Sequence, residues 1–314
     1  VDGVVVADPF ALAALMELTG PIEVPSVGFP LDGDNAAEFL LREQYILYEG
    51  ERAERKDRLE DVAEATFEAL TERSLPGPRQ LGKVLGPTVA EKRLMFFPFD
   101  AEGQGLIEDM GALGRFEQPE GSDLLSVRTA NLRANKIDTF VHRSITYDAA
   151  YDAGTGTVDA TVTVVVRNDA PSSGLPDYII GPVGASEPQG TSRVLTAVFT
   201  PLLATGATVD GEAVGVEPQQ EVGLNVFSVP LTIPPGGQVT LELSLSGTVE
   251  GMGDTYRLLA SSQPLANPDD LTVRIRPAAG TPGFEELRGL EVTDGVATAE
   301  GRWTRDRRFA AGPG

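Results

Sequence analysis

The sequence predicts an α+β protein of several domains, in which an α/β portion is followed by antiparallel β-sandwich domains. Over roughly the first 120 residues, short apolar runs alternate with helical patterns, as in an α/β layer. From about residue 124 onward, short alternating runs are separated by turn signals such as Gly154-Thr155-Gly156 and Asp210-Gly211. We therefore divide the chain into a partial α/β domain (1–123), a β-sandwich (124–250) and a further β-rich segment (251–314) that forms part of a second sandwich.

The N-terminal elements follow from periodicity and from helix-capping residues. Residues 1–8 are a short β-branched run with polar ends, which predicts a buried strand. Asp8 is placed to cap a helix that Pro9 begins and that Gly20-Pro21 ends. Further elements are expected as a strand at 22–24, a long helical region from 32–35 to Leu70, a helix at 79–94, a strand at 95–99 and a helix at 101–111.

The C-terminal part carries the pattern of a sandwich. The clearest predicted strand is 157–166, where polar and apolar residues alternate along its first half and three valines end it. Residues 233–237, Ile-Pro-Pro-Gly-Gly, form a turn before a strand that is typical of immunoglobulin-like modules. The other expected strands are 124–129, 139–147, 192–199, 207–209, 225–229, 238–245, 256–261 and 271–275.

Composition excludes several classes of function. The chain has 314 residues and a net charge of −22, with neither half basic, so binding to nucleic acid or to anionic lipid by bulk charge is not expected. It has no cysteine, which excludes thiol catalysis and cysteine-ligated metals, and its single histidine, His142, argues against a Ser-His-Asp hydrolase and against a histidine-rich metal site. No apolar run approaches the roughly 20 residues of a membrane helix. We expect a piece of a longer protein, in which any membrane anchor lies outside this chain.

A set of short motifs spread over much of the chain resembles the bacterial domain of unknown function 4012. The motifs are Val1-Asp2-Gly3-Val4 with Asp8-Pro9, Leu18-Thr19-Gly20-Pro21, Asn131 with Asn135-Lys136-Ile137-Asp138, and Asn168-Asp169-Ala170-Pro171 with Gly174-Leu175-Pro176-Asp177-Tyr178. The resemblance implies a large, membrane-anchored envelope protein of actinobacteria or their relatives, with an upstream half that contains the membrane helix. It implies no known activity.

Residues 1–72 also resemble, more distantly, the second half of a LytR-CpsA-Psr domain, through the order strand, helix, Thr-Gly-Pro, strand and a helix entering an Arg/Asp-rich segment. Enzymes with that domain transfer glycopolymers from a polyprenyl pyrophosphate carrier onto peptidoglycan. By position, the resemblance implies phosphate contacts for Arg42 and Arg58 and a Mg²⁺ contact for Asp57. Acidic residues crowd the same stretch, whereas a pyrophosphate pocket needs dense positive charge.

The basic cluster Arg52, Arg55, Lys56 and Arg58 has two interpretations. It can hold an anion or phosphate at a helix start, with Arg55 beside Arg58, or it can be a solvated helix face with pairs such as Glu54 and Arg58. Lys136 and Asp138 are expected to fix the junction between the two halves of the chain. The basic end around Trp303 is expected to be a fraying terminus, with polymer binding as the alternative.

These observations leave three hypotheses. The first is a noncatalytic, extracytoplasmic scaffold or interaction module of the bacterial cell surface, linked to cell-wall or surface glycopolymers or to other envelope proteins, with no cofactor. The second is a phosphotransferase-like enzyme acting on polyprenyl-linked glycopolymers, with Mg²⁺ and with an active site completed by an upstream half. The third is a surface adhesin or fibre component. The catalytic residues, if there are any, are not identified by the sequence.

Overall fold

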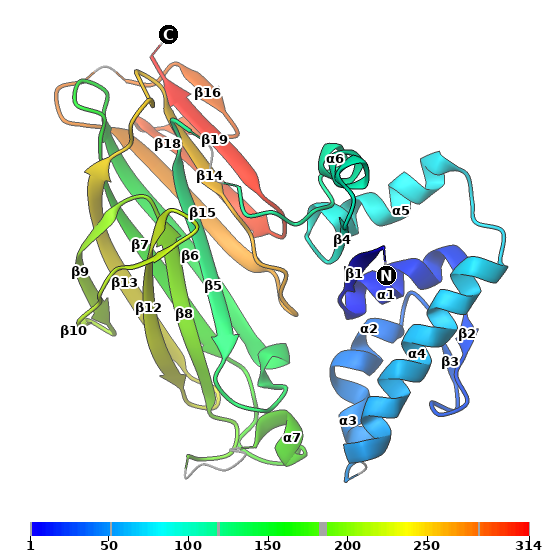
Figure 1. Cartoon of the computed structure of the whole chain (residues 1–314). Coiled ribbons are helices and arrows are strands. Elements are labelled where there is room, and N and C mark those ends of the chain that lie inside the picture. The colour runs from blue at the N-terminus through cyan, green and yellow to red at the C-terminus, as the bar shows by residue number, and fades with distance from the viewer. Residues whose placement is uncertain (1, 51, 118–119, 182–186, 282, 314) are drawn as a thin grey trace. The chain divides into compact units, whose positions relative to one another are not determined.

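The computed structural model describes residues 2–50, 52–117, 120–181, 187–281 and 283–313. The chain divides into two compact units, Val1–Arg115 and Phe116–Gly314 (Figure 1). Each unit has its own apolar core. The predicted boundary at 123/124 therefore lies eight residues too late, because the strand that opens at Asp123 is preceded by a segment that already belongs to the second unit.

The first unit is mainly helical. Helix α1 (Pro9–Thr19) begins as predicted: the Asp8 carboxylate accepts a hydrogen bond from the Ala11 backbone N–H at 2.9 Å, and Gly20 ends the helix with a φ of 76°. The predicted long helical region is divided into pieces. The remaining helices are α2 (Ala36–Glu38), the π-helical η1 (Phe39–Glu43), α3 (Gln44–Leu47), α4 (Arg52–Glu72), α5 (Pro78–Ala90) and α6 (Ala101–Asp109).

The strands of the first unit form two small antiparallel pairs, β1 (Gly3–Ala7) with β4 (Leu94–Pro98) and β2 (Ile22–Glu23) with β3 (Pro30–Leu31). The described residues of the first unit thus hold two separate two-stranded sheets and not the single α/β layer that was predicted. The prediction that residues 1–8 are buried is also wrong, since Val5 is 61% exposed. Its valines satisfy the pattern of a buried strand, but successive side chains point to opposite faces, and the exposure of Val4, Val5 and Val6 shows that neither face of β1 is covered.

The core of the first unit lies among α1, η1, α4 and the β2–β3 hairpin. Met16, Leu31 and Phe39 are almost completely buried there, and the Phe29 ring meets the Phe39 ring edge-on with centroids 5.4 Å apart. Burial of such side chains contributes about 1.5–3 kcal/mol each. This cluster fixes α1, which forms one wall of the groove described below.

The second unit consists of two large mixed sheets packed face to face (Figure 1). The eight-stranded sheet has the order β10-β9-β13-β7-β6-β15-β18-β17, and the seven-stranded sheet has the order β11-β12-β8-β5-β14-β19-β16. The strands are β5 (Asp123–Asn131), β6 (Val141–Asp152), β7 (Thr157–Asn168), β8 (Ser192–Thr200), β9 (Leu203–Val209), β10 (Glu212–Ala213), β11 (Gln219–Glu221), β12 (Leu224–Ile233), β13 (Gln238–Thr248), β14 (Tyr256–Ala260), β15 (Asp269–Pro277), β16 (Glu286–Arg288), β17 (Glu291–Thr293), β18 (Val296–Trp303) and β19 (Arg307–Gly312). Two short helices, η2 (Ile137–Phe140) and α7 (Asp177–Ile180), accompany them.

One core fills the space between the two sheets. Val162 of β7 and Leu241 of β13 enter it from one sheet, and Val198 of β8 and Phe227 of β12 enter it from the other. The sheets are not purely antiparallel as predicted, because β14 pairs in parallel with β5 and β15 pairs in parallel with β6. Residues 251–314 complete these same two sheets and are not a separate second sandwich.

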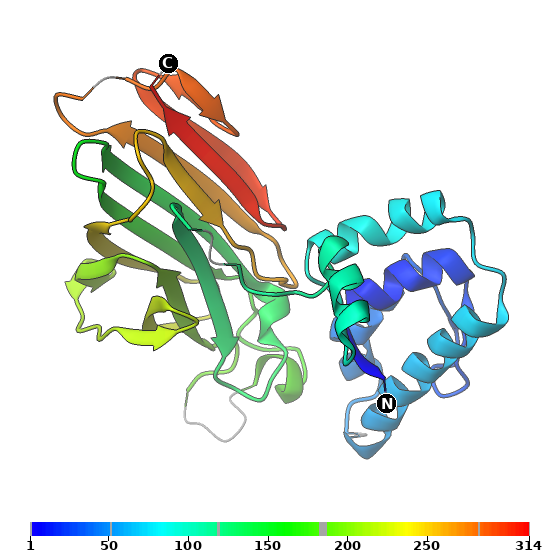
Figure 2. The same cartoon turned by 45° about the horizontal axis from the view of Figure 1, so that its top comes forward.

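The C-terminal strands β18 and β19 are integral to the second unit. Trp303 is 1% exposed and belongs to the core, and β19 pairs with β14 on one side and β16 on the other (Figure 2). The expectation of a fraying basic terminus is therefore wrong. Arg302 and Arg308 are exposed beside the buried Trp303 and Phe309, as expected for successive residues of a strand, and Arg305 lies in the turn between β18 and β19.

Candidate functional sites

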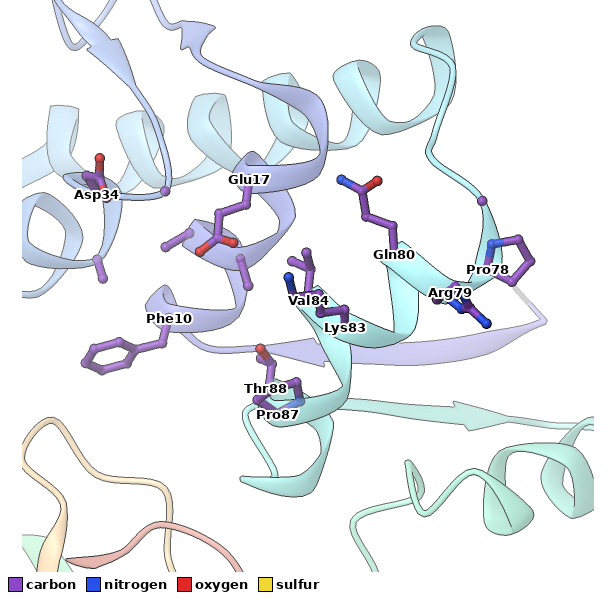
Figure 3. A pocket seen from close by; sticks show the side chains of 15 residues that line it. Phe10, Glu17, Asp34, Pro78, Arg79, Gln80, Lys83, Val84, Pro87 and Thr88 are labelled. Carbon is purple, nitrogen blue, oxygen red and sulfur yellow. The ribbon is translucent and has the colours of Figure 1, made fainter.

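A wide groove lies between α1 and α5 in the first unit (Figure 3). Its volume is about 1200 Å³, slightly above the usual range of small-molecule sites, and it is open to solvent. The groove exists because its walls are built from small residues, with Ala13 and Ala14 on α1, Ala37 on α2, and Gly33 and Gly77 in the adjoining loops. Longer apolar side chains line the rest: Phe10, Val84 and Pro87.

Opposite charges line the two walls of this groove. Glu17 projects from α1, and Lys83 projects from α5 with its ammonium group directed toward Glu17 (Figure 3). Among the ion pairs that join described residues, none connects these two side chains. Asp34 adds a carboxylate on the α1 side, and Arg79 adds a cation near the start of α5.

A second, shallower hollow of about 670 Å³ lies on the outer face of the eight-stranded sheet. It spans five neighbouring strands, β9, β13, β7, β6 and β15. Its lining is dominated by hydroxyl, carboxylate and guanidinium groups: Thr146, Asp148, Asp159, Thr161, Thr163, Thr205, Ser244, Ser246, Arg274 and Arg276. These residues face outward because alternate residues of the same strands enter the core.

Strand register arranges these groups in rows across the sheet. One row runs Ser244, Thr161, Asp148, Arg274 over β13, β7, β6 and β15. The next row runs Ser246, Asp159, Ala150, Arg276. Adjacent strands are about 4.8 Å apart, so the first row presents a polar group at that repeat, and the second row does so except at Ala150. Asp148 of the first row forms an ion pair with Arg276 of the second row. Within the second row, the Ser246 hydroxyl donates to Asp159 at 2.6 Å.

The most perturbed carboxylate, Asp123, lies deep in the second unit. It accepts hydrogen bonds from the Tyr147 and Tyr256 hydroxyls and from the Leu124 N–H, and it is completely buried. Burial raises the pKa of Asp123 to about 6, although the three hydrogen bonds act in the opposite direction. Sequence reasoning missed this cluster, since the two tyrosines lie 24 and 133 residues away in the chain. Its full burial identifies it as a structural network and not as a reactive group open to a substrate.

A buried ion pair lies in the same unit. The Arg143 guanidinium holds Asp269 through two hydrogen bonds, of 2.8 and 2.5 Å, and also donates to the Thr129 hydroxyl and to the Val127 carbonyl. Burial raises the pKa of Asp269 despite the neighbouring cation. The pair joins β6 to β15 and so supports one of the two parallel strand pairs.

The residues predicted to bind phosphate have other described partners. Arg42 pairs with Glu38 one helical turn away and is partly exposed. Arg58 is only 5% exposed: its guanidinium lies 3.7 Å from the centre of the Tyr48 ring and donates to the Ser26 carbonyl at 3.1 Å. The predicted Glu54–Arg58 pair is not among the described ion pairs, and the side chain of Arg55 lies outside the described part of the chain. No described contact brings Arg42 and Arg58 together.

The predicted metal ligand Asp57 is an exposed residue of α4. Among the described residues, no three His, Cys, Asp or Glu side chains are grouped as metal ligands are. A Mg²⁺ ion needs several oxygen ligands in octahedral geometry, which a lone exposed carboxylate can supply only together with substrate and water.

Lys136 and Asp138 do not lie at the junction between the units. Both are in the second unit, at the loop and helix η2 between β5 and β6. The Asp138 carboxylate accepts from the Asn131 side chain at 2.9 Å, and the Lys136 N–H donates to the Tyr178 carbonyl at 3.0 Å. These contacts hold the turn at the end of the sandwich. His142 is a partly exposed residue whose Nε2 lies 3.5 Å from Asp169.

An exposed apolar surface surrounds the β1–β4 pair in the first unit. Val4, Val5 and Val6 are 48–61% exposed, and further large apolar residues are exposed on β4, on α6 and directly after them: Phe97, Phe99, Leu106 and Met110. The second edge of β1 pairs with no described strand. By contrast, the edge strands of the two large sheets are only two or three residues long, which is a common protection against edge-to-edge association.

Comparison with known proteins gives a partial family match. Residues 1–45 match the family described as "Protein of unknown function (DUF4012)". This match supports the resemblance drawn from the short motifs at the start of the chain. Curated proteins gave no match. No helix in the described ranges is both long and apolar enough to span a bilayer.

Solved structures that resemble the chain are distant in sequence and in geometry. Leukotriene A4 hydrolase from Saccharomyces cerevisiae is 11% identical with a TM-score of 0.34, over 59% of this chain and 29% of the hydrolase. An M1 zinc metallopeptidase from Deinococcus radiodurans is 17% identical with a TM-score of 0.27, over 55% of this chain and 42% of the peptidase. The chain thus spans less than half the length of either protein.

Proposed function

We propose that this protein is a noncatalytic interaction module of a bacterial cell envelope that binds cell-wall or surface glycopolymers. The observation that carries the proposal is the polar hollow on the eight-stranded sheet. Its lining offers hydroxyls that both donate and accept, carboxylates that accept, and guanidinium groups that donate. A glycan presents many hydroxyls of the same dual character, so it can satisfy these groups along its length.

The rigidity of the sheet supports the same function. The lining residues stand on five hydrogen-bonded strands, and alternate residues on those strands are locked into the core. Their positions are therefore set before a ligand arrives, which reduces the entropy lost on binding. The hollow is shallow and open, and each hydrogen bond contributes about 1 kcal/mol net. We accordingly expect weak binding per site and stronger binding to long polymers through repeated contacts.

The envelope location belongs to the proposal as well. It rests on what the resemblance of the short motifs implies, and the match of residues 1–45 supports that resemblance. In this proposal the protein acts outside the cytoplasm, anchored to a membrane through a segment outside this chain. An actinobacterial source and an immunoglobulin-like ancestry of the sandwich are parts of the same proposal.

The phosphotransferase-like alternative has less support. It requires Arg42 and Arg58 to hold phosphates and Asp57 to hold Mg²⁺. Glu38 neutralises Arg42, and the Arg58 guanidinium is stacked on Tyr48 beneath the surface. A substrate pyrophosphate would have to displace both sets of contacts.

The experiment is a calorimetric titration of the protein with purified wall glycopolymers of Gram-positive bacteria. Thr161→Val and Thr146→Val remove single hydroxyls from the hollow at nearly constant volume. Each should weaken binding about three- to tenfold, as expected for the loss of one hydrogen bond. Thr240→Val, on β13 of the same sheet but outside the hollow, is the matched control and should leave the affinity unchanged. Equal affinities for all four proteins would contradict the proposal.

Assembly with another envelope protein is a second candidate, favoured by the apolar surface around β1. A five-residue valine-rich edge can accept a strand from a partner, and the exposed Phe97 and Phe99 add apolar area beside it. In this second candidate, Val5→Lys should abolish cross-linking from β1 to envelope proteins in intact cells, while Val292→Lys on the short edge strand β17 should not. Unchanged cross-linking in Val5→Lys would exclude the β1 edge.

A further inference from the structure

We propose that the groove between α1 and α5 binds short peptides by their free termini, with the peptide ammonium at Glu17 and the peptide carboxylate at Lys83. This site lies in the first unit and is independent of the polymer site proposed on the sheet. The opposed charges of its two walls carry the inference, because a ligand that bears both charges satisfies both walls at once (Figure 3).

The helix dipoles strengthen the same polarity. Glu17 lies in the last turn of α1, where the carbonyl ends of the helix favour a cation. Arg79 and Lys83 lie in the first two turns of α5, where the N–H ends favour an anion. Side-chain charge and helix dipole therefore have the same sign on each wall, which fixes the direction in which a peptide lies.

Glu17 is held toward the groove by its neighbours. Gly33 passes so close that a Cβ atom at that position would lie 2.6 Å from the Glu17 Cγ. The absence of a side chain at Gly33 thus lets the loop pack against Glu17 and limit its rotation. A positioned carboxylate loses less entropy when it receives an ammonium group than a freely rotating one.

The lining of the groove suits small apolar residues and peptide groups. Ala13, Ala14 and Val84 line it with small apolar side chains, which suit ligand side chains the size of alanine. Gln80 and the Thr88 hydroxyl lie along α5 and can donate to and accept from a peptide bond (Figure 3). The ligand class that follows is an alanine-rich peptide of a few residues with both termini free.

The test is a nuclear magnetic resonance titration of the ¹⁵N-labelled full chain with three peptides: trialanine, N-acetyl-trialanine and trialanine amide. Free trialanine should shift amide signals of α1 and α5 with millimolar affinity, since solvent-exposed ion pairs are individually weak. Acetylation removes the ammonium and amidation removes the carboxylate. Each should weaken binding up to about fivefold, the effect expected from one exposed ion pair.

Two variants complete the cycle. Glu17→Gln should weaken trialanine and its amide but leave the acetylated peptide unaffected, and Lys83→Met should weaken trialanine and the acetylated peptide but leave the amide unaffected. Glu68→Gln and Lys56→Met, exposed substitutions of the same kind on α4, are matched controls and should change nothing. The proposal is overturned if trialanine shifts no amide signals of α1 and α5, or if free and blocked peptides bind equally well. It is also overturned if Glu17→Gln weakens the binding of the acetylated peptide as much as that of trialanine.

Discussion

Replacing Asp123 by Asn should remove a specific pH dependence from the stability of the second unit. The folded carboxyl has a pKa of about 6 against an ordinary value of 3.8, because it is buried between Tyr147 and Tyr256. A group whose pKa is raised by folding binds its proton more tightly in the folded state. Its contribution to stability is therefore fully present below about pH 3.8 and is lost as pH rises through about 6.

The size of this effect follows from the shift. A rise of about two pKa units corresponds to a loss on the order of 3 kcal/mol between those two pH values. Between about pH 3.8 and 6, the free energy of unfolding of the wild-type protein should therefore fall by that amount relative to that of Asp123→Asn. Asn cannot titrate, so any hydrogen bond that it fails to make adds only an offset that does not change with pH.

Urea unfolding followed by tryptophan fluorescence measures the effect. Trp303 is the only tryptophan of the chain and is buried in the second unit, so its emission reports the unfolding of that unit. The pKa of Asp269 is also raised, but Asp269 is present in both proteins, and the difference between them isolates Asp123. The measured quantity is the free energy of unfolding of the wild type minus that of Asp123→Asn. If this difference stays constant from about pH 3.5 to 7, or increases with pH, the reasoning is refuted.

Three further substitutions test structural roles assigned above. Arg58→Ala should destabilise the first unit by about 2–4 kcal/mol through loss of the Tyr48 stacking and the Ser26 hydrogen bond, whereas Arg42→Ala should cost at most about 0.5 kcal/mol because its pair with Glu38 is exposed. Thermal melts followed by far-UV circular dichroism compare the two, and equal losses would contradict the burial of Arg58. Arg143→Met should destabilise the second unit by about 3–5 kcal/mol near pH 7, since it leaves Asp269 buried without its cation, and the loss should shrink in acid as Asp269 is protonated. Fluorescence-detected urea unfolding at two pH values checks this, and a loss that grows in acid would contradict it.

The parts of the fold that were predictable from sequence are those that local pattern determines. Strand β7 alternates over most of its length, and the Asp8-Pro9 start of α1 uses a side chain that caps its own helix. Both were predicted because the information lies within a few residues. Strand β19 was missed because only Phe309 marks it as apolar among arginines, alanines and a glycine, and its partner β14 lies about fifty residues earlier.

Burial and site geometry were less predictable, since they depend on partners that sequence does not identify. The valines of β1 have the pattern of a buried strand, yet they are exposed because neither face of that strand is covered. Arg58 has the appearance of a surface cation, but the Tyr48 ring and the Ser26 carbonyl hold it inside. The rows of the polar hollow depend on the register of β13, β7, β6 and β15, and no single segment of the chain contains that register.

The most direct test of glycopolymer binding is to locate the bound polymer on the protein. A fragment of a wall glycopolymer should be titrated into ¹⁵N-labelled protein while the amide signals of both units are followed. Glycan binding at the polar hollow predicts shifts at Thr161, Asp148 and Ser244 and their strand neighbours, with the amides of α1 and α5 unchanged. Shifts confined to the first unit, or no shifts with a polymer that the envelope contains, would contradict the proposed function.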